Sequence, residues 1–201
     1  MRTSSESIEE PHWVSRSAYQ VVTILFLASE IALAAVLYQR ASMWWVAGLV
    51  LLISHLMHGS LVGFHEASHG LLRRNRRFNE VNGVVLGILS FMSFSLYRAA
   101  HQTHHANLGT ERDEELWPFV LTHMPRWKRV LAAFLELSVG LLFTPFLFQR
   151  TFLRKGSPIR QKKVRRRIWT EMITIAVVWI AILVAVAYFQ GLTHSELAAT
   201  L

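Results

Sequence analysis

Five histidines in two clusters are the residues of this chain best suited to chemistry. The first cluster is His65-Glu-Ala-Ser-His69, and the second is His101-Gln-Thr-His104-His105. Positions i and i+4 of a helix share one face, so His65 and His69 can reach the same metal ion. The three imidazoles of the second cluster fan over roughly a quarter-turn of a helix and can address two ions. The two clusters together therefore predict a metal centre.

The absence of cysteine limits the kind of metal centre. Disulfides, thiolate-ligated haem, iron–sulfur clusters and cysteine-type zinc sites are excluded. Any metal must therefore be held by nitrogen or oxygen, and the clustered histidines supply the nitrogen.

The first cluster alone is open to a second interpretation. His65, Glu66 and His69 also match the HExxH pattern of zinc proteases, in which the glutamate acts as general base. That interpretation predicts one zinc ion and gives no role to His101–His105. A membrane zinc protease is therefore kept as an alternative.

Apolar blocks predict the elements that position the histidines. The chain is 52% hydrophobic and 17% charged, with a mean hydropathy of +0.31. Three segments approach the roughly 20 apolar residues that a membrane span needs. They are about Ser17–Tyr38, Met43–Phe64 and Ile168–Phe189. We expect an all-α integral membrane protein, with residues 1–201 as a single domain and the first two spans as a transmembrane hairpin.

Two further apolar blocks, Val81–Leu96 and Val130–Phe148, are predicted to re-enter the membrane or lie in its interface. Nine basic residues without an intervening acid follow the second block: Arg150, Arg154, Lys155, Arg160, Lys162, Lys163, Arg165, Arg166 and Arg167. The positive-inside rule places this loop in the cytoplasm. If the two histidine clusters share a metal site, both lie on the cytoplasmic side and neither block crosses.

The net charge of +8 does not predict nucleic-acid binding, because the charge sits mainly in this one loop beside an apolar segment. One explanation of the basic charge in this loop is membrane topology, which retains positive loops in the cytoplasm. The other explanation is the docking of an acidic electron donor.

The stretch from Met43 to Pro118 resembles the membrane fatty acid desaturases. The resemblance rests on Gly63–Gly70, Arg98, His101–His105, Asp113 and Trp117-Pro118. It implies that two non-haem irons are held by His65, His69, His101, His104 and His105. It also makes Glu66 and Asp113 candidates to accept a ring N–H and fix the ligand's tautomer. Asp113 as a helix cap or a solvated loop acid is the alternative.

The same resemblance implies oxygen-dependent desaturation of a fatty acyl chain, with O₂ as co-substrate. It implies a lipid or acyl thioester substrate, and a ferredoxin- or cytochrome-type electron donor. Nothing in the five histidines separates desaturation from the chemistry of a related hydroxylase or carotenoid ketolase, so both stay open.

The chain departs from the family pattern after the second cluster. The family normally has a further span and a third [HQ]xxHH box, and no HxxHH follows His105 here. Two irons together want roughly eight or more protein ligands, which five imidazoles do not supply. We therefore expect an N-terminal portion with an incomplete site, and an inactive fragment is one alternative.

Overall fold

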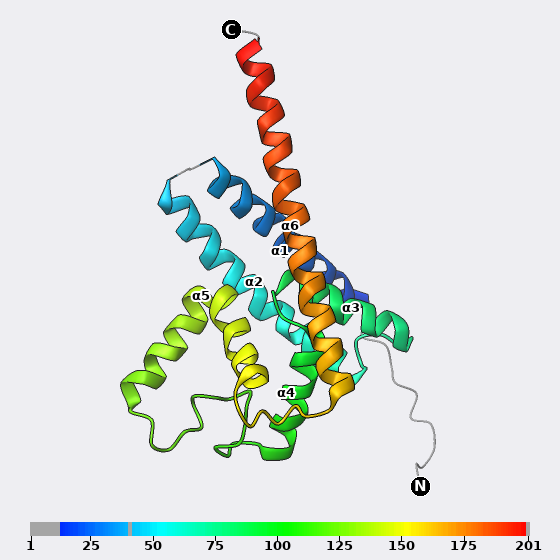
Figure 1. The fold of residues 1–201 in the computed structure, drawn as a ribbon, viewed down its shortest axis with the longest axis vertical. Helices are drawn as coiled ribbons and strands as arrows, with labels where there is room; N and C mark the ends of the chain where they lie inside the picture. The colour runs from blue at the N-terminus through cyan, green and yellow to red at the C-terminus, as the bar shows by residue number, and fades with distance from the viewer. Residues whose placement is uncertain (1–12, 40–41, 200–201) are drawn as a thin grey trace.

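A computed structural model describes residues 13–39 and 42–199, which form helices joined by turns and loops and contain no strand (Figure 1). The prediction of an all-α protein is confirmed. The helices are α1 (Trp13–Tyr38), α2 (Met43–His69), α3 (Arg76–Leu89), α4 (Phe94–Asn107), α5 (Arg126–Leu153) and α6 (Lys162–Ala199). For the first predicted span, the side chains of residues 17–20 and 38 lie outside the described residues.

Three described helices are long and apolar enough to cross a membrane: α2, α5 and residues Lys162–Phe189 of α6. In α1, the described apolar stretch is the shorter Val21–Leu37. Large apolar side chains on α6 are exposed, among them Ile173, Val177, Ile180 and Val184. Lipid is the solvent that suits such a face. These helices make the chain a membrane protein, and α2 continues without a break through the first histidine cluster.

Helix α5 is bent into two arms. Its backbone leaves the helical region at Val139, with φ −130° and ψ 32°, and Figure 1 shows both arms descending from their junction. Ser54 of α2 accepts a hydrogen bond from the Leu141 N–H at 3.3 Å, and its hydroxyl lies 3.5 Å from the Ser138 carbonyl oxygen. Non-helical backbone within a membrane needs partners of this kind. The bend means that α5 is not one straight helix.

Helices α3 and α4 meet at an angle of 101°, and two glycines make the turn possible. A Cβ on Gly83 would lie 2.5 Å from the ring of Phe94, and a Cβ on Gly87 would lie 2.5 Å from a backbone carbonyl oxygen of the turn. Phe91 adopts φ 51° at the corner and stacks on Trp179 of α6 at 4.8 Å. The bend returns the chain from α3, so that α4 lies beside the end of α2.

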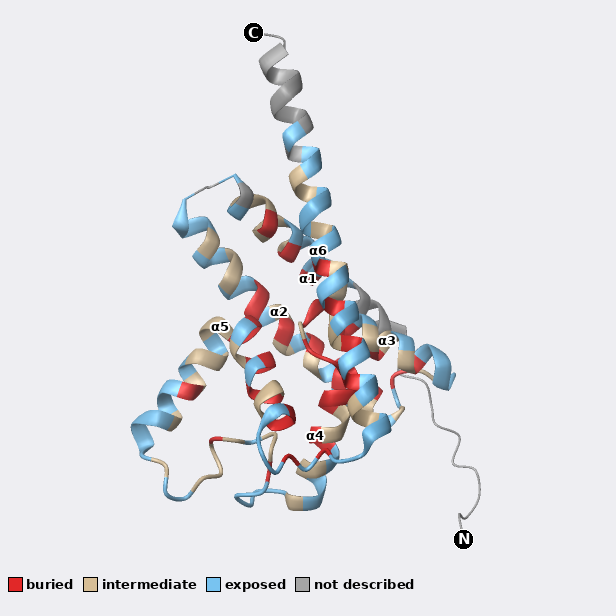
Figure 2. Cartoon of the chain, in the orientation of Figure 1, coloured by how far each residue is buried: buried red, intermediate tan, exposed pale blue. Residues whose placement is uncertain are grey.

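Helix α6 is joined to the start of α4 by a buried carboxylate. Glu171 accepts hydrogen bonds from the Ser93 hydroxyl at 2.7 Å, the Ser95 hydroxyl at 2.6 Å and the Ser95 N–H at 2.8 Å. Around this junction lies the largest cluster of buried side chains, which includes Phe64 and Phe152 (Figure 2). The position of α4 is therefore set by both polar and apolar contacts.

The glycine contact at the bend is testable. We expect Gly83→Ala to lower the free energy of unfolding by about 1–3 kcal/mol, because the new methyl group overlaps the buried ring of Phe94. Gly48→Ala is the matched control, since a Cβ at Gly48 in α2 has nothing within 4 Å. It should be neutral or stabilise by up to about 1 kcal/mol. Thermal unfolding in detergent measures both, and equal stability of the two variants would contradict the packing argument.

Candidate metal centre

The end of α2 holds the first histidine cluster in a fixed place. Gly70 ends the helix in the left-handed conformation, with φ 79°, and its N–H donates to the Ala67 carbonyl. The buried side chain of Asn79 in α3 donates to the same carbonyl at 2.8 Å and accepts from the Arg73 N–H at 3.2 Å. The last turn of α2 is thereby joined to α3, and its imidazoles face α4.

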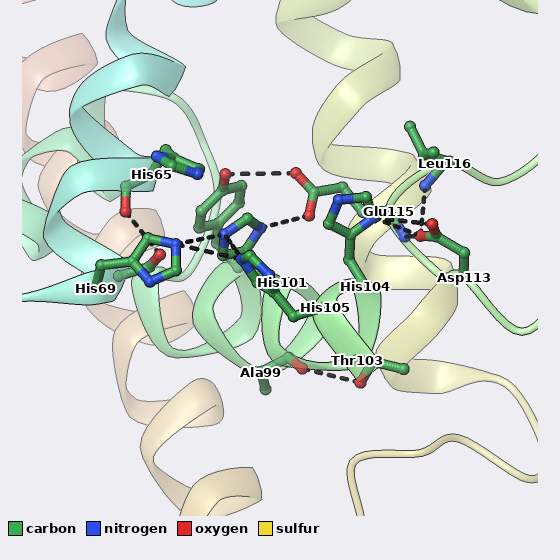
Figure 3. Close-up of polar contacts among 12 residues, drawn as sticks. His65, His69, Ala99, His101, Thr103, His104, His105, Asp113, Glu115 and Leu116 are labelled. Atoms are coloured by element: carbon green, nitrogen blue, oxygen red, sulfur yellow. Dashed lines mark hydrogen bonds and ion pairs between the residues drawn. The ribbon is translucent and has the colours of Figure 1, made fainter. Parts of the chain in front are cut away.

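Imidazoles from α2 and α4 converge on one point (Figure 3). Nε2 of His101 lies 3.0 Å from Nε2 of His69 and 3.0 Å from Nε2 of His105. Nε2 of His105 lies 3.3 Å from Nε2 of His69. With His65, these residues offer four ring nitrogens that all lie within 4.8 Å of one another. His101 is buried at the centre of this group.

The spacing of the three Nε2 atoms fits a metal ion. Two imidazole nitrogens bound at about 2.1 Å lie about 3.0 Å apart at a right angle and about 3.4 Å apart at a tetrahedral angle. A ring nitrogen has a single in-plane position for a proton or a lone pair, so the three close contacts cannot all be hydrogen bonds. Three lone pairs directed at one cation explain the triangle, and imidazole suits iron, zinc, copper and nickel alike.

A carboxylate from the loop after α4 orients the central histidine. Nδ1 of His101 lies 2.6 Å from Oε2 of Glu115, and a carboxylate can only accept, so Nδ1 carries the proton. The Nε2 of this ring is then left with its lone pair directed at His69 and His105. The Tyr97 hydroxyl donates to the other oxygen of Glu115 at 3.4 Å. Such outer partners of a metal-binding histidine fix its tautomer and raise its basicity.

His104 is separate from the convergent group. Its Nδ1 donates to both oxygens of Asp113, at 2.9 and 2.8 Å. Burial opposes ionisation of Asp113, but the bonds from His104 and from the N–H groups of Gly109 and Leu116 outweigh it and hold the pKa of this carboxyl below its usual range. Asp113 therefore stays an acceptor, and Nε2 of His104 keeps a lone pair for a different position from that of the other three.

The structure thus brings together His65, His69, His101 and His105 of the five predicted ligands. Glu66 lies beside His65, with 3.3 Å between Oε1 and Nδ1. Sequence reasoning missed Glu115. It belongs to the acidic run Glu-Arg-Asp-Glu-Glu at 111–115, the first carboxylates after the second cluster, and this run was the available signal.

Another member of the run fastens the loop to α5. Glu114 accepts from the Arg150 guanidinium and the Thr151 hydroxyl, both at 3.1 Å, and pairs with Arg154. The Arg150 guanidinium also covers the ring of Trp117 at 3.8 Å. The loop that carries the orienting carboxylates is consequently held between α4 and α5.

Comparison with known proteins agrees with this geometry. Residues 42–200 match the sequence model of the fatty acid desaturase family. The chain belongs to this family. This chain is 28% identical over 153 residues to the sn-1 acyl-lipid omega-3 desaturase (ferredoxin) of Synechocystis. The match covers 74% of this chain and 41% of the relative, so the chain spans less than half of that relative's length. No solved structure matches this chain.

The Glu115–His101 contact gives a testable expectation. Glu115→Gln removes the charge that orients the His101 ring, and should weaken metal binding by about 10–100-fold. Glu111→Gln is the control, because Glu111 contacts Thr122 and His123 and lies outside the imidazole contacts of the candidate metal centre. Metal retained after titration with a chelator measures both. Equal retention in the two variants would show that Glu115 does not act through His101.

Proposed function

We propose that this chain holds iron through its histidine clusters and contributes to oxygen-dependent desaturation of fatty acyl chains. The observation that carries the proposal is the triangle of imidazole nitrogens from α2 and α4, with His101 oriented by Glu115. Family membership supports iron over the other metals that imidazole suits, because this family is known for a di-iron centre.

When bound, non-haem iron would supply the oxidant that an unactivated methylene pair requires, which no side chain provides. Two hydrogens leave the acyl chain, and O₂ with two electrons and two protons becomes two waters. The residues of this chain would hold the iron and orient the imidazoles that bind it. His65, His69, His101 and His105 form one group, while His104, oriented by Asp113, offers Nε2 at a second position.

The number of donors in this chain limits how many iron ions we expect it to bind. Five imidazoles supply fewer than the roughly eight donors that two irons want. Glu66 and Glu115 contact ring nitrogens, so in this arrangement both orient ligands. We propose that the chain by itself retains fewer than two irons, with the group around His101 as the tighter site.

For the substrate we propose an acyl lipid that enters from the membrane, and for the reductant a ferredoxin-type donor. The similar Synechocystis protein is an sn-1 acyl-lipid desaturase that carries ferredoxin in its name. The exposed apolar faces of the spanning helices give lipid direct access to the protein. Figure 1 shows α4 at the same end of the molecule as the start of α6, where the basic run lies. We therefore propose the cytoplasmic side for the histidines.

Metal analysis of the detergent-purified chain tests the site. We expect iron to be bound in the wild-type chain and lost in His105→Ala, because Nε2 of His105 is one corner of the triangle. His55→Ala is the matched control. His55 lies on α2, but its ring bonds the Leu51 carbonyl at 2.9 Å, so iron should be unchanged.

The outcome decides between chemistries. Loss of iron in His105→Ala but not in His55→Ala supports the proposal. Fatty acid analysis of cells that express the chain with a ferredoxin then separates desaturated from hydroxylated products. Stoichiometric zinc that survives His105→Ala, with peptidase activity lost in Glu66→Gln, would replace the proposal with the protease interpretation. A folded chain that binds neither metal would overturn it.

A further inference from the structure

A basic cavity lies on the other side of the helix that carries the second histidine cluster. It has a volume of about 450 Å³ and lies between α4 and the segment from Pro158 to Arg167. Arg98, Arg160 and Arg167 line it together with the amide side chains of Gln102 and Gln161. No carboxylate is among its described lining residues. This volume lies within the range of small-molecule sites.

Most of the α4 residues that line the cavity lie on the other side of the helix from the candidate metal centre. Ala99, Thr103 and Ala106 line the cavity, and at about 100° per residue they lie about 140–200° around the helix from His101. His105 is about 40° from His101 by the same measure and belongs to the other face. The cavity is therefore not part of the imidazole site.

The charges around the cavity are incompletely neutralised. Two carboxylates lie close by, and both are already paired. Glu80 bonds Arg98 and Arg167, each at 2.5 Å, and Glu171 bonds Arg167 at 3.0 Å. Within the part of the chain that the structure describes, Arg160 forms no ion pair or hydrogen bond through its side chain. One full positive charge is left for a ligand.

Unused donors also surround the cavity. Nε of Arg98 is buried and has no hydrogen-bond partner among the described residues. The side-chain amides of Gln102 and Gln161 are exposed and have no hydrogen-bond partner in the described chain. A buried N–H without an acceptor costs free energy, and the exposed amides beside it are free to donate to an acceptor that enters the cavity. An anion with several oxygens would both neutralise the unpaired positive charge and accept hydrogen bonds from the unused N–H groups.

We infer that this cavity binds a phosphate group, and that the phosphate is that of an anionic lipid headgroup. Guanidinium groups bind phosphate oxygens with two parallel hydrogen bonds, and amide N–H groups satisfy the remaining oxygens. The cavity opens where α6 starts, and residues Lys162–Phe189 of α6 suit a membrane span. That is the depth of lipid headgroups, and basic pockets between helices at this depth bind them.

Lipid binding to the full chain in neutral detergent tests the inference and needs no metal or activity. The probe is phosphatidylglycerol, followed by native mass spectrometry and by the shift in unfolding temperature. Arg160→Gln should weaken binding by about tenfold or more, because a charge-assisted contact to phosphate is lost. Arg160 is exposed and unpaired, so the variant should fold, which circular dichroism verifies.

Arg166→Gln is the matched control, since Arg166 lies in the same basic segment, is exposed and is not among the lining residues. Its effect should stay below about threefold. Equal weakening in both variants would show a general surface charge and overturn the inference, as would equal binding of a neutral glycolipid. Inorganic phosphate is the other arm. If inorganic phosphate raises the unfolding temperature and Arg160→Gln abolishes this rise, the phosphate site stands. The site is then assigned to a soluble phosphate compound rather than to a lipid.

Discussion

Three imidazole nitrogens within 3.3 Å of one another are the constraint on which the rest of this structure depends. The three contacts cannot all be hydrogen bonds, because each ring nitrogen has a single position for a proton or a lone pair, so other contacts must hold the rings in place. These contacts come from outside the triangle. Glu115 fixes His101 through its outer nitrogen, and the bonds of Asn79 fix the turn of α2 that carries His69. Outer contacts of this kind orient metal-binding imidazoles and raise their basicity.

The polar contacts that support the triangle lie between helices rather than within them. Glu114 fastens the acidic loop to α5, and Glu171 fastens the start of α4 to α6. In the apolar interior, Ser54 satisfies the backbone at the break in α5. Glu171 and Ser54 bond backbone N–H groups, and Glu114 bonds side-chain donors of α5. A few polar side chains thus set the relative positions of helices whose remaining contacts are non-directional.

Much of this arrangement follows from period and composition, and the remainder depends on tertiary contacts. Apolar length predicted the helices, and the i, i+4 spacing placed His65 with His69. The fan of the second cluster predicted that its histidines could address two ions. The same geometry explains why His104, about 100° from His105 around the helix, joins a different carboxylate. Glu115 could not be assigned in advance, because a non-periodic loop decides which acid of the run meets which ring. Likewise, α5 contains Pro145, but its break lies at Val139, where Ser54 is within reach.

Helix α4 separates two electrostatic environments across its own width, about 10 Å with side chains. Its front carries imidazoles that contact Asp113 and Glu115, an arrangement that attracts a cation. Its back lines a cavity with the unpaired charge of Arg160, which attracts an anion. Had the acids and the free arginine shared one face, they would have neutralised one another and left no site of either kind. The glycine-dependent bend before α4 lets its front meet α2, while the start of α6 covers its back. One short helix can therefore present donors for a metal to one side and donors for a phosphate to the other.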